Sequence, residues 1–355
     1  MATIISRPDS LSFLTGINDL KFQTGADHVV LTVTIAHAGS TETVMQETMY
    51  PIGGYVALEE MSQLLEPYIR RYLSATVSFQ ISERDASDTQ TASTSLGPYT
   101  VLFSMVDIGD DTVSTFTSSH FLTILNGEKM TAMGREERLY AYNASQVTIT
   151  ATLLVSGSYV TRTATLNAAA TTGGVSAFFV GPDNVHTLLS NEGRLTAYTV
   201  TAGSREQRFV MVEDDVPPAP SLAFINSFGC LEFLHCVGTH KKDSKYDRSS
   251  ARINGMKRNY KVTEDRQFTA NTGWLNTPMA DWADEVMRSQ EVYVWVDGRP
   301  WKEVVLSDSK SVITNEDDDM PAFELTYSYS QRIHNVMQRQ HAGRIFDNTF
   351  DHTFN

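Results

Sequence analysis

The sequence predicts a mainly β protein of several domains, in which a β-sandwich-like middle domain is flanked by two strand-rich α+β domains with one helix each. Alternation of apolar and polar residues, which is typical of half-buried strands, is the dominant pattern along the chain. Turn dipeptides such as Asn126-Gly127 and Asp297-Gly298 separate the alternating stretches. The nine expected strands are 29–37, 75–82, 98–106, 147–155, 175–180, 194–200, 205–212, 291–296 and 323–330.

Two stretches have a helical period. The first is 57–73, where Pro67 is expected to kink or split the helix. The second is 279–289, which follows Pro278, a residue well suited to the first turn of a helix. The apolar stripe of the first helix consists of Leu58, Met61, Leu65, Tyr68 and Tyr72, and the inward-facing residues of the second are Trp282, Val286 and Met287.

The 355 residues are enough for two or three domains. The clearest boundary is EDDVPPAPS, where acidic residues and three prolines predict a stiff, extended linker. The middle part has about ten strand-length units and almost no helix signal, which favours a sandwich. We therefore expect an N-terminal α+β domain at 1–110, a sandwich-like domain at 111–215, a Pro-rich linker at 216–221, a C-terminal α+β domain at 222–335 and an interaction tail at 336–355.

Charge and composition exclude several classes of protein. The net charge of −14 argues against general nucleic-acid binding and against an anionic membrane surface. No apolar run approaches the roughly 20 residues of a membrane span, and the first residues do not resemble a signal peptide. Cys230 and Cys236 would lie roughly 20 Å apart along a strand, too far for a disulfide. We expect a protein that is made in the cytoplasm, with no membrane span and no nucleic-acid partner.

Catalytic signatures are missing from the sequence. There is no phosphate-binding glycine loop, dinucleotide fingerprint, HExxH or GxSxG motif. His235, Cys236 and His240 with Cys230 fit no zinc spacing, and we interpret them as buried cysteines beside a surface histidine. The acidic run 316–319 lacks the glycine and the alternating ligands of a calcium loop, so a solvated hairpin tip is the better interpretation. We predict no enzyme, no cofactor and no metal.

The stretch 239–261 is the strongest charge anomaly. Eight basic and two acidic residues give it a charge of +6 inside an acidic chain, with Tyr246 and Tyr260 interleaved. Three interpretations stay open: a solvated hairpin or loop, a patch that meets an acidic surface on another subunit, and a nucleic-acid contact. The basic residues chosen as partner-binding candidates are Lys241, Lys242, Lys245, Arg248, Arg252, Lys257 and Arg258.

The chain ends RIFDNTFDHTFN, with Phe346, Phe350 and Phe354 at a spacing of four. The residues between them are mediocre helix formers, and the segment is too short to hold a helix alone. The tail either packs on its own domain, docks onto a neighbouring subunit or is disordered. The three phenylalanines are partner-binding candidates because each buried aromatic contributes roughly 1.5–3 kcal/mol.

Four stretches together resemble the β-rich virion proteins encoded in the tail gene region of phages and prophages of Bacteroidetes. The stretches are YPIGGYVALEEMSQLLEPYI at 50–69, FINSFGCLEFLHCVG at 224–238, WADEVMRSQEVYVWVDGRPWKEVVLSDSK at 282–310 and the ending RIFDNTFDHTFN at 344–355. The resemblance covers the first and third segments with the tail, and it does not extend to the middle segment. It implies a structural role in the virion, in the tail tip or baseplate, and it supplies no catalytic residues.

The expected function is therefore protein–protein assembly in a virion, with other virion proteins as partners and a homo-oligomer in a ring. One alternative is a module that binds host-surface glycan, for which Tyr140, Tyr142, Tyr159 and Tyr198 could form an aromatic platform. Another alternative is decoration of the head or capsid. Trp295 and Trp301 flank the Asp297-Gly298 turn, so we expect them to pack together across a hairpin.

Overall fold

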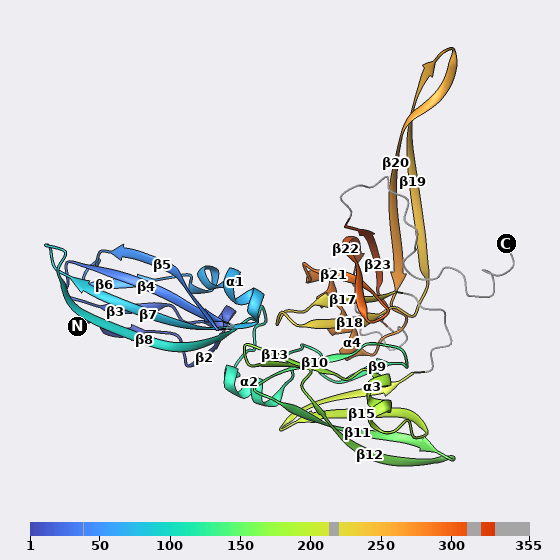
Figure 1. The fold of residues 1–355 in the computed structure, drawn as a ribbon, viewed down its shortest axis with the longest axis horizontal. Helices are drawn as coiled ribbons and strands as arrows, with labels where there is room; N and C mark the ends of the chain where they lie inside the picture. Colours follow the sequence, from blue (N-terminus) through green and yellow to red (C-terminus); the bar gives the residue numbers. More distant parts are fainter. Residues whose placement is uncertain (38, 213–219, 311–320, 331–355) are drawn as a thin grey trace.

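The protein is mainly β, as the sequence predicts, and its described residues form five sheets and a few short helices. The computed structural model describes residues 1–37, 39–212, 220–310 and 321–330. Figure 1 shows an elongated N-terminal part, a middle part, a C-terminal part beside it and a long hairpin that projects from the C-terminal part. Each sheet is formed by one continuous region of the chain: 3–102 for two sheets, 128–211 for two more and 221–329 for the last.

The N-terminal part contains a sheet of order β1-β3-β6 and a sheet of order β2-β8-β7-β4-β5. Alternation in β4 buries Val29, Leu31, Val33 and Ile35 in one core cluster with residues of both sheets. Its elements are β1 (Thr3–Ser6), β2 (Leu11–Phe13), η1 (Leu14–Gly16), β3 (Leu20–Gln23), β4 (His28–His37), β5 (Ser40–Met49), β6 (Tyr55–Leu58), α1 (Met61–Tyr72), β7 (Ser74–Arg84) and β8 (Gln90–Leu102).

The first predicted helix is shorter than expected. It begins at Met61 because Tyr55–Leu58 forms β6, where Leu58 pairs with Leu20 of β3. Leu58 is buried because it alternates with less buried residues in this short strand, so its position on the predicted helical stripe was coincidental. Helix α1 continues through Pro67 without a break, so the predicted split is wrong.

The middle part contains a three-stranded sheet of order β10-β14-β13 and a five-stranded sheet of order β12-β11-β15-β16-β9. Inward residues of both sheets share one core cluster, which gives the sandwich-like arrangement. Its elements are α2 (Val113–Ser119), β9 (Glu128–Thr131), β10 (Arg138–Tyr142), β11 (Gln146–Val155), β12 (Ser158–Asn167), β13 (Ala170–Thr172), β14 (Val175–Phe179), α3 (Pro182–Leu188), β15 (Arg194–Ala202) and β16 (Arg205–Met211).

Two helices of the middle part were not expected from the sequence. Each of α2 and α3 has seven residues, too few for a helical period to stand out. Their start signals are local: the Thr112 side chain accepts a hydrogen bond from the Thr115 amide, and Pro182 occupies the first turn of α3.

The C-terminal part is a single seven-stranded sheet of order β18-β17-β21-β22-β23-β20-β19. The helix predicted at 279–289 is two short helices, α4 and α5, and they supply Trp282 and Val286 to the core as predicted. Its elements are β17 (Ser221–Ile225), β18 (Leu231–His235), β19 (His240–Ile253), β20 (Met256–Asn271), α4 (Thr277–Ala283), α5 (Glu285–Arg288), β21 (Val292–Val296), β22 (Arg299–Lys310) and β23 (Glu324–Tyr329).

The predicted pairing of Trp295 with Trp301 is wrong. Trp295 lies opposite Pro300, while Val294 lies opposite Lys302, so Trp301 is the extra residue of a β-bulge. The two rings therefore have different neighbours: Trp295 contacts the ring of Phe233 and Trp301 contacts that of Tyr329.

All nine expected strands are present, although β8 begins at Gln90 and ends at Leu102 rather than spanning 98–106. Several predictions lie outside the described residues: most of the linker 216–221, the acidic run 316–319, and the tail 336–355.

An apolar joint connects the three parts. It consists of buried residues from each of them: Phe13, Leu102, Leu122, Val175, Phe228 and Cys230. The rings of Phe13, Phe116 and Phe228 lie 5.6–5.7 Å apart by their centroids. The Met105 amide also donates a 2.7 Å hydrogen bond to the Ser227 carbonyl. Burial of these apolar side chains stabilises the contact among the three parts.

Candidate functional site

The basic stretch predicted as a hairpin or loop is a long antiparallel hairpin, which we call the arm (β19 and β20, His240–Asn271). Asn254 and Gly255 form its two-residue turn, with φ values of 51° and 78°. Positive φ at both central residues is what a type I′ turn requires, and Asn-Gly is the dipeptide that favours it.

Within the residues that the structure describes, the rest of the C-terminal sheet pairs with the arm only at its base. Strand β20 pairs with β23 over the four residues Phe268–Asn271, and Phe268 is buried against Tyr327 at a ring distance of 5.3 Å. From Asp243 and Gln267 outward to the turn, β19 and β20 pair only with each other in the described structure, over roughly 35 Å at about 3.3 Å per residue. Figure 1 shows this hairpin extending well beyond the rest of the sheet.

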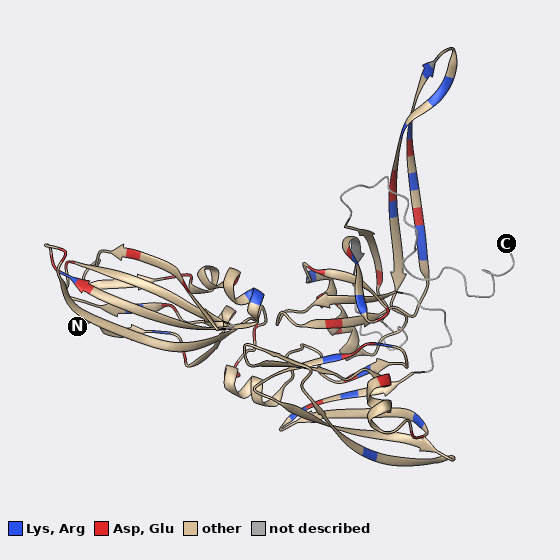
Figure 2. Cartoon of the chain, in the orientation of Figure 1, with Lys and Arg blue, Asp and Glu red and all other residues tan. Residues whose placement is uncertain are grey.

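All seven predicted basic residues lie on the arm, and all except the half-buried Lys242 are exposed. Ion pairs near the base join Lys241 to Asp243 at 2.7 Å and Arg266 to Glu264 at 2.6 Å. The distal part, 248–262, which we call the arm tip, contains no acidic residue (Figure 2). Its five cations are Arg248, Arg252, Lys257, Arg258 and Lys261.

Repulsion between like charges destabilises the arm tip when no partner covers it. Arg252 lies directly opposite Lys257, and like charges in such a cross-strand pair are destabilising. Tyr260 is the extra residue of a β-bulge and is 66% exposed, and Met256 beside the turn is 56% exposed. A two-stranded hairpin is marginally stable in water, so this surface favours a partner that supplies negative charge and apolar cover.

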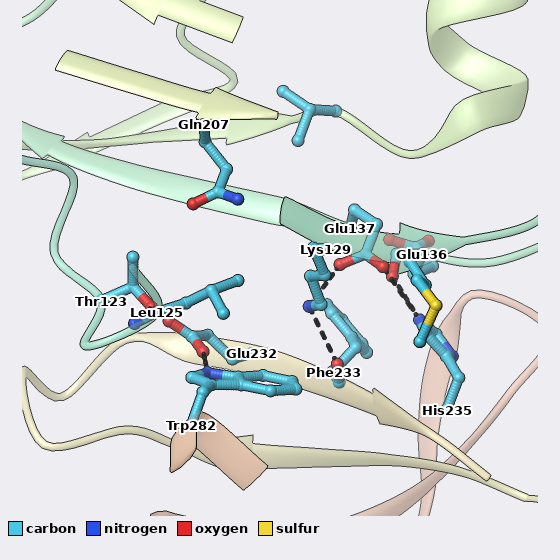
Figure 3. Close-up of polar contacts among 12 residues, drawn as sticks. Thr123, Leu125, Lys129, Glu136, Glu137, Gln207, Glu232, Phe233, His235 and Trp282 are labelled. Atoms are coloured by element: carbon cyan, nitrogen blue, oxygen red, sulfur yellow. Dashed lines mark hydrogen bonds and ion pairs between the residues drawn. The ribbon is translucent and has the colours of Figure 1, made fainter. Parts of the chain in front are cut away.

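A layer of buried polar side chains lies between the middle part and the C-terminal part (Figure 3). Lys129 of β9 forms a 2.6 Å ion pair with Glu137 and donates a 3.0 Å hydrogen bond to the Phe233 carbonyl. The Lys129 ammonium lies 4.4 Å from the ring centroid of Trp282. Burial raises the pKa of Glu137, but Lys129 and His235 outweigh this and hold it below the ordinary value. Glu137 is therefore a buried carboxylate that binds two parts of the chain together.

His235 of β18 completes this layer. Its Nε2 lies 3.3 Å from Glu137 Oε1 and 3.2 Å from the Glu136 carbonyl, and its Nδ1 lies 2.8 Å from the Ser221 hydroxyl. Burial lowers the pKa of His235, which favours the neutral ring. Only 8% of His235 is exposed, so the surface position expected from the sequence is wrong.

Serine, histidine and glutamate in this order have the residue types of a nucleophile, a base and an acid. However, Glu137 already has Lys129 as its ion-pair partner. A neighbouring cavity of about 240 Å³ is lined by Lys129 and His235 but not by Ser221. The contacts of Glu137 and His235 join β18 to the middle part, which is the arrangement of a buried structural network.

Two further buried carboxylates lie nearby. Glu232 accepts hydrogen bonds from the Trp282 indole N–H and, at 2.9 Å, from the Asn226 amide, which also donates to the Leu122 carbonyl. Burial raises the pKa of Glu232. These bonds connect the C-terminal part to the middle part.

Glu285 accepts a 2.7 Å hydrogen bond from the Ser227 amide, next to the joint. Burial, reinforced by the charge of Glu232, raises its pKa to about 7. The Glu232–Glu285 pair is thus a site where one carboxylate retains a proton near neutral pH.

Other predicted site residues are dispersed. Tyr198 is buried and donates a 2.7 Å hydrogen bond to the Val180 carbonyl, while Tyr140 and Tyr142 pack at the joint. Only Tyr159 of the four predicted tyrosines is exposed, so they do not form a shared platform. Phe346, Phe350 and Phe354 lie outside the described residues.

Cys230 and Cys236 are buried free thiols, and burial raises the pKa of both. His240 stacks on Phe268 and Tyr327 at the base of the arm. In the described part of the chain, no helix has the length and apolar character needed to cross a membrane.

No family model matches this chain, and comparison with curated proteins finds no match. The resemblance to phage tail-region proteins thus stays a prediction.

The sequence did not predict the buried polar layer. Lys129, Glu137 and His235 are separated by up to about a hundred residues and carry no motif, because their contacts arise where two sheets meet. Strand β9 is EKMT, and its two buried positions are the polar residues Lys129 and Thr131, so no apolar alternation marked this strand in the sequence.

Proposed function

We propose that this chain is a structural component of a bacteriophage virion, in the tail tip or baseplate, and that it acts by protein–protein assembly. The observation that carries the assembly role is the arm. It is a long two-stranded element with charged and apolar residues exposed on both faces, and a packed three-part body supports its base. An element of this kind gains stability when a neighbour covers it.

The placement in a tail is supported by the resemblance of the first and third segments to tail-region virion proteins. Decoration of the head is the alternative that assembly alone does not distinguish. The glycan-binding alternative loses support because three of its four tyrosines are not exposed.

The test measures whether purified phage-like particles contain the chain and where an antibody against it binds on them. Phage-like particles purified from the strain that encodes this chain should contain it at a fixed copy number by quantitative mass spectrometry. Antibody against the chain should label the tail end in electron micrographs. Label on the head would favour decoration, and absence of the chain from washed particles would refute a structural role in the virion.

A further inference from the structure

A second surface of the molecule is complementary to the arm tip. A cleft of about 970 Å³ lies where the N-terminal part meets α2, between residues 9–16 and residues 105–114. Its lining contains Asp9, Asp107 and Asp111, all exposed, and no lysine, arginine or histidine. We call it the acidic cleft.

Apolar groups line the same cleft. Leu11, Val106 and Ile108 are half-buried there, and Met105 is 57% exposed. The cleft therefore offers negative charge together with apolar surface. The arm tip carries the matching set: five cations without an acidic residue, the exposed Met256 beside the turn and the exposed Tyr260 further along β20.

The shapes are also compatible. The arm ends in a two-residue turn between strands that lie roughly 5 Å apart, so its end is narrow. A narrow, positively charged end and an open, negatively charged cleft are the arrangement that gives specific, charge-steered association.

The arm and the acidic cleft of one chain are far from each other. In Figure 1 the arm extends away from β2 and α2, which border the cleft. A contact between the two surfaces must therefore join two molecules. Because the surfaces differ, the contact is head-to-tail, and repetition of it closes a ring or continues as a filament.

We infer that the arm tip of one copy enters the acidic cleft of the next copy. This inference rests on the proposed function, since it names the partner of the arm as a second copy of the same chain. The cations of the tip lie against the three aspartates, and the turn with Met256 meets the apolar wall. The like-charge repulsion between Arg252 and Lys257 is relieved in this contact.

The experiment is a charge swap with the full-length protein, read by sedimentation velocity at low and at raised ionic strength. The arm variant is Arg252→Glu with Lys257→Glu and Arg258→Glu, which leaves two cations against three glutamates on the tip, a net charge of −1. The cleft variant is Asp9→Lys with Asp107→Lys and Asp111→Lys, which replaces the three negative charges of the cleft lining by three positive ones. These side chains are exposed, so both variants should fold, which circular dichroism and thermal melting would verify. The matched control is Glu206→Lys, an exposed position on β16.

The wild-type protein and the control should self-associate at low ionic strength and dissociate as salt is added. Each reversed variant alone should associate roughly tenfold more weakly or worse, because the arm and the cleft then carry like charges. An equimolar mixture of the two variants should associate again, because each arm then finds a cleft of opposite charge.

Three results would overturn the inference. One is a wild-type chain that stays monomeric at every concentration tested, and another is association that neither reversal changes. The third is tight binding of a short DNA duplex that the arm variant abolishes, without any effect of the cleft variant. None of these results bears on whether the chain is present in purified particles, so failure here is distinguishable from failure of the virion role.

Discussion

Replacement of Glu285 by glutamine should stabilise the protein above neutral pH and have little effect in mild acid. The carboxyl group is 3% exposed and lies near Glu232, and its pKa is raised from 4.5 to about 7. The proton is therefore bound more tightly in the folded than in the unfolded state. The stabilisation from this proton is complete below pH 4.5 and is lost as the pH rises through 7.

The magnitude follows from the difference between the two pKa values. A rise from 4.5 to about 7 corresponds to roughly 3 kcal/mol of unfolding free energy that the wild-type protein lacks at pH 8. Glutamine cannot ionise, and its carbonyl oxygen keeps an acceptor for the Ser227 amide. The Glu285→Gln variant therefore does not lose this free energy of unfolding as the pH rises.

The assay is urea unfolding of both proteins at several pH values between 4.5 and 8, with the exposed Glu206→Gln as control. The stability of Glu285→Gln relative to wild type should increase with pH by up to about 3 kcal/mol. The difference in stability between Glu206→Gln and wild type should stay the same at every pH. A difference between Glu285→Gln and wild type that does not change with pH would refute the reasoning.

Three other predictions concern packing and assembly. Lys129→Met should lower the free energy of unfolding in urea by about 3–5 kcal/mol, because it leaves Glu137 buried without its cation. Adding Glu137→Gln to this variant should restore much of that free energy. Equal stability of the single and double variants would contradict this prediction. Phe228→Ala should lower the free energy of unfolding by about 3–5 kcal/mol, because the ring fills the joint between the three parts. Tyr159→Ala, at a 73% exposed position, should lower it by less than about 1 kcal/mol. Similar values for both variants would contradict the stabilising role of the joint. If Phe346, Phe350 and Phe354 dock onto a neighbouring subunit, truncation after Arg339 should leave a folded chain that light scattering shows to associate more weakly than the full-length protein under the same conditions. Unfolding of the C-terminal part on truncation would instead place the tail in its own core.

Local patterns in the sequence determined most of the strands. The alternation in 29–37 and 147–155 has period two over nearly its whole length, and one face of each strand is buried as predicted. The Asn254-Gly255 dipeptide likewise determines its turn, because both residues tolerate positive φ. The basic character of the arm is also a property of the sequence alone.

Predictions from the local sequence pattern were wrong where a segment distant in the chain determines the local structure. Tyr55–Leu58 is a strand rather than the start of a helix because β3 offers it hydrogen-bond partners. Trp295 and Trp301 are separated by a bulge that the spacing of the two residues does not reveal.

The function-related geometry depended on tertiary structure for the same reason. The buried layer of Lys129, Glu137 and His235 exists because two sheets from distant regions enclose these side chains and remove them from water. Among the described residues, most of the arm has no third strand beside it because β23 pairs with only four residues of β20. The acidic cleft brings Asp9 beside Asp107 and Asp111 across about a hundred residues. Periodicity reports what each residue prefers locally, whereas burial, exposure and charge clustering depend on which distant segments meet.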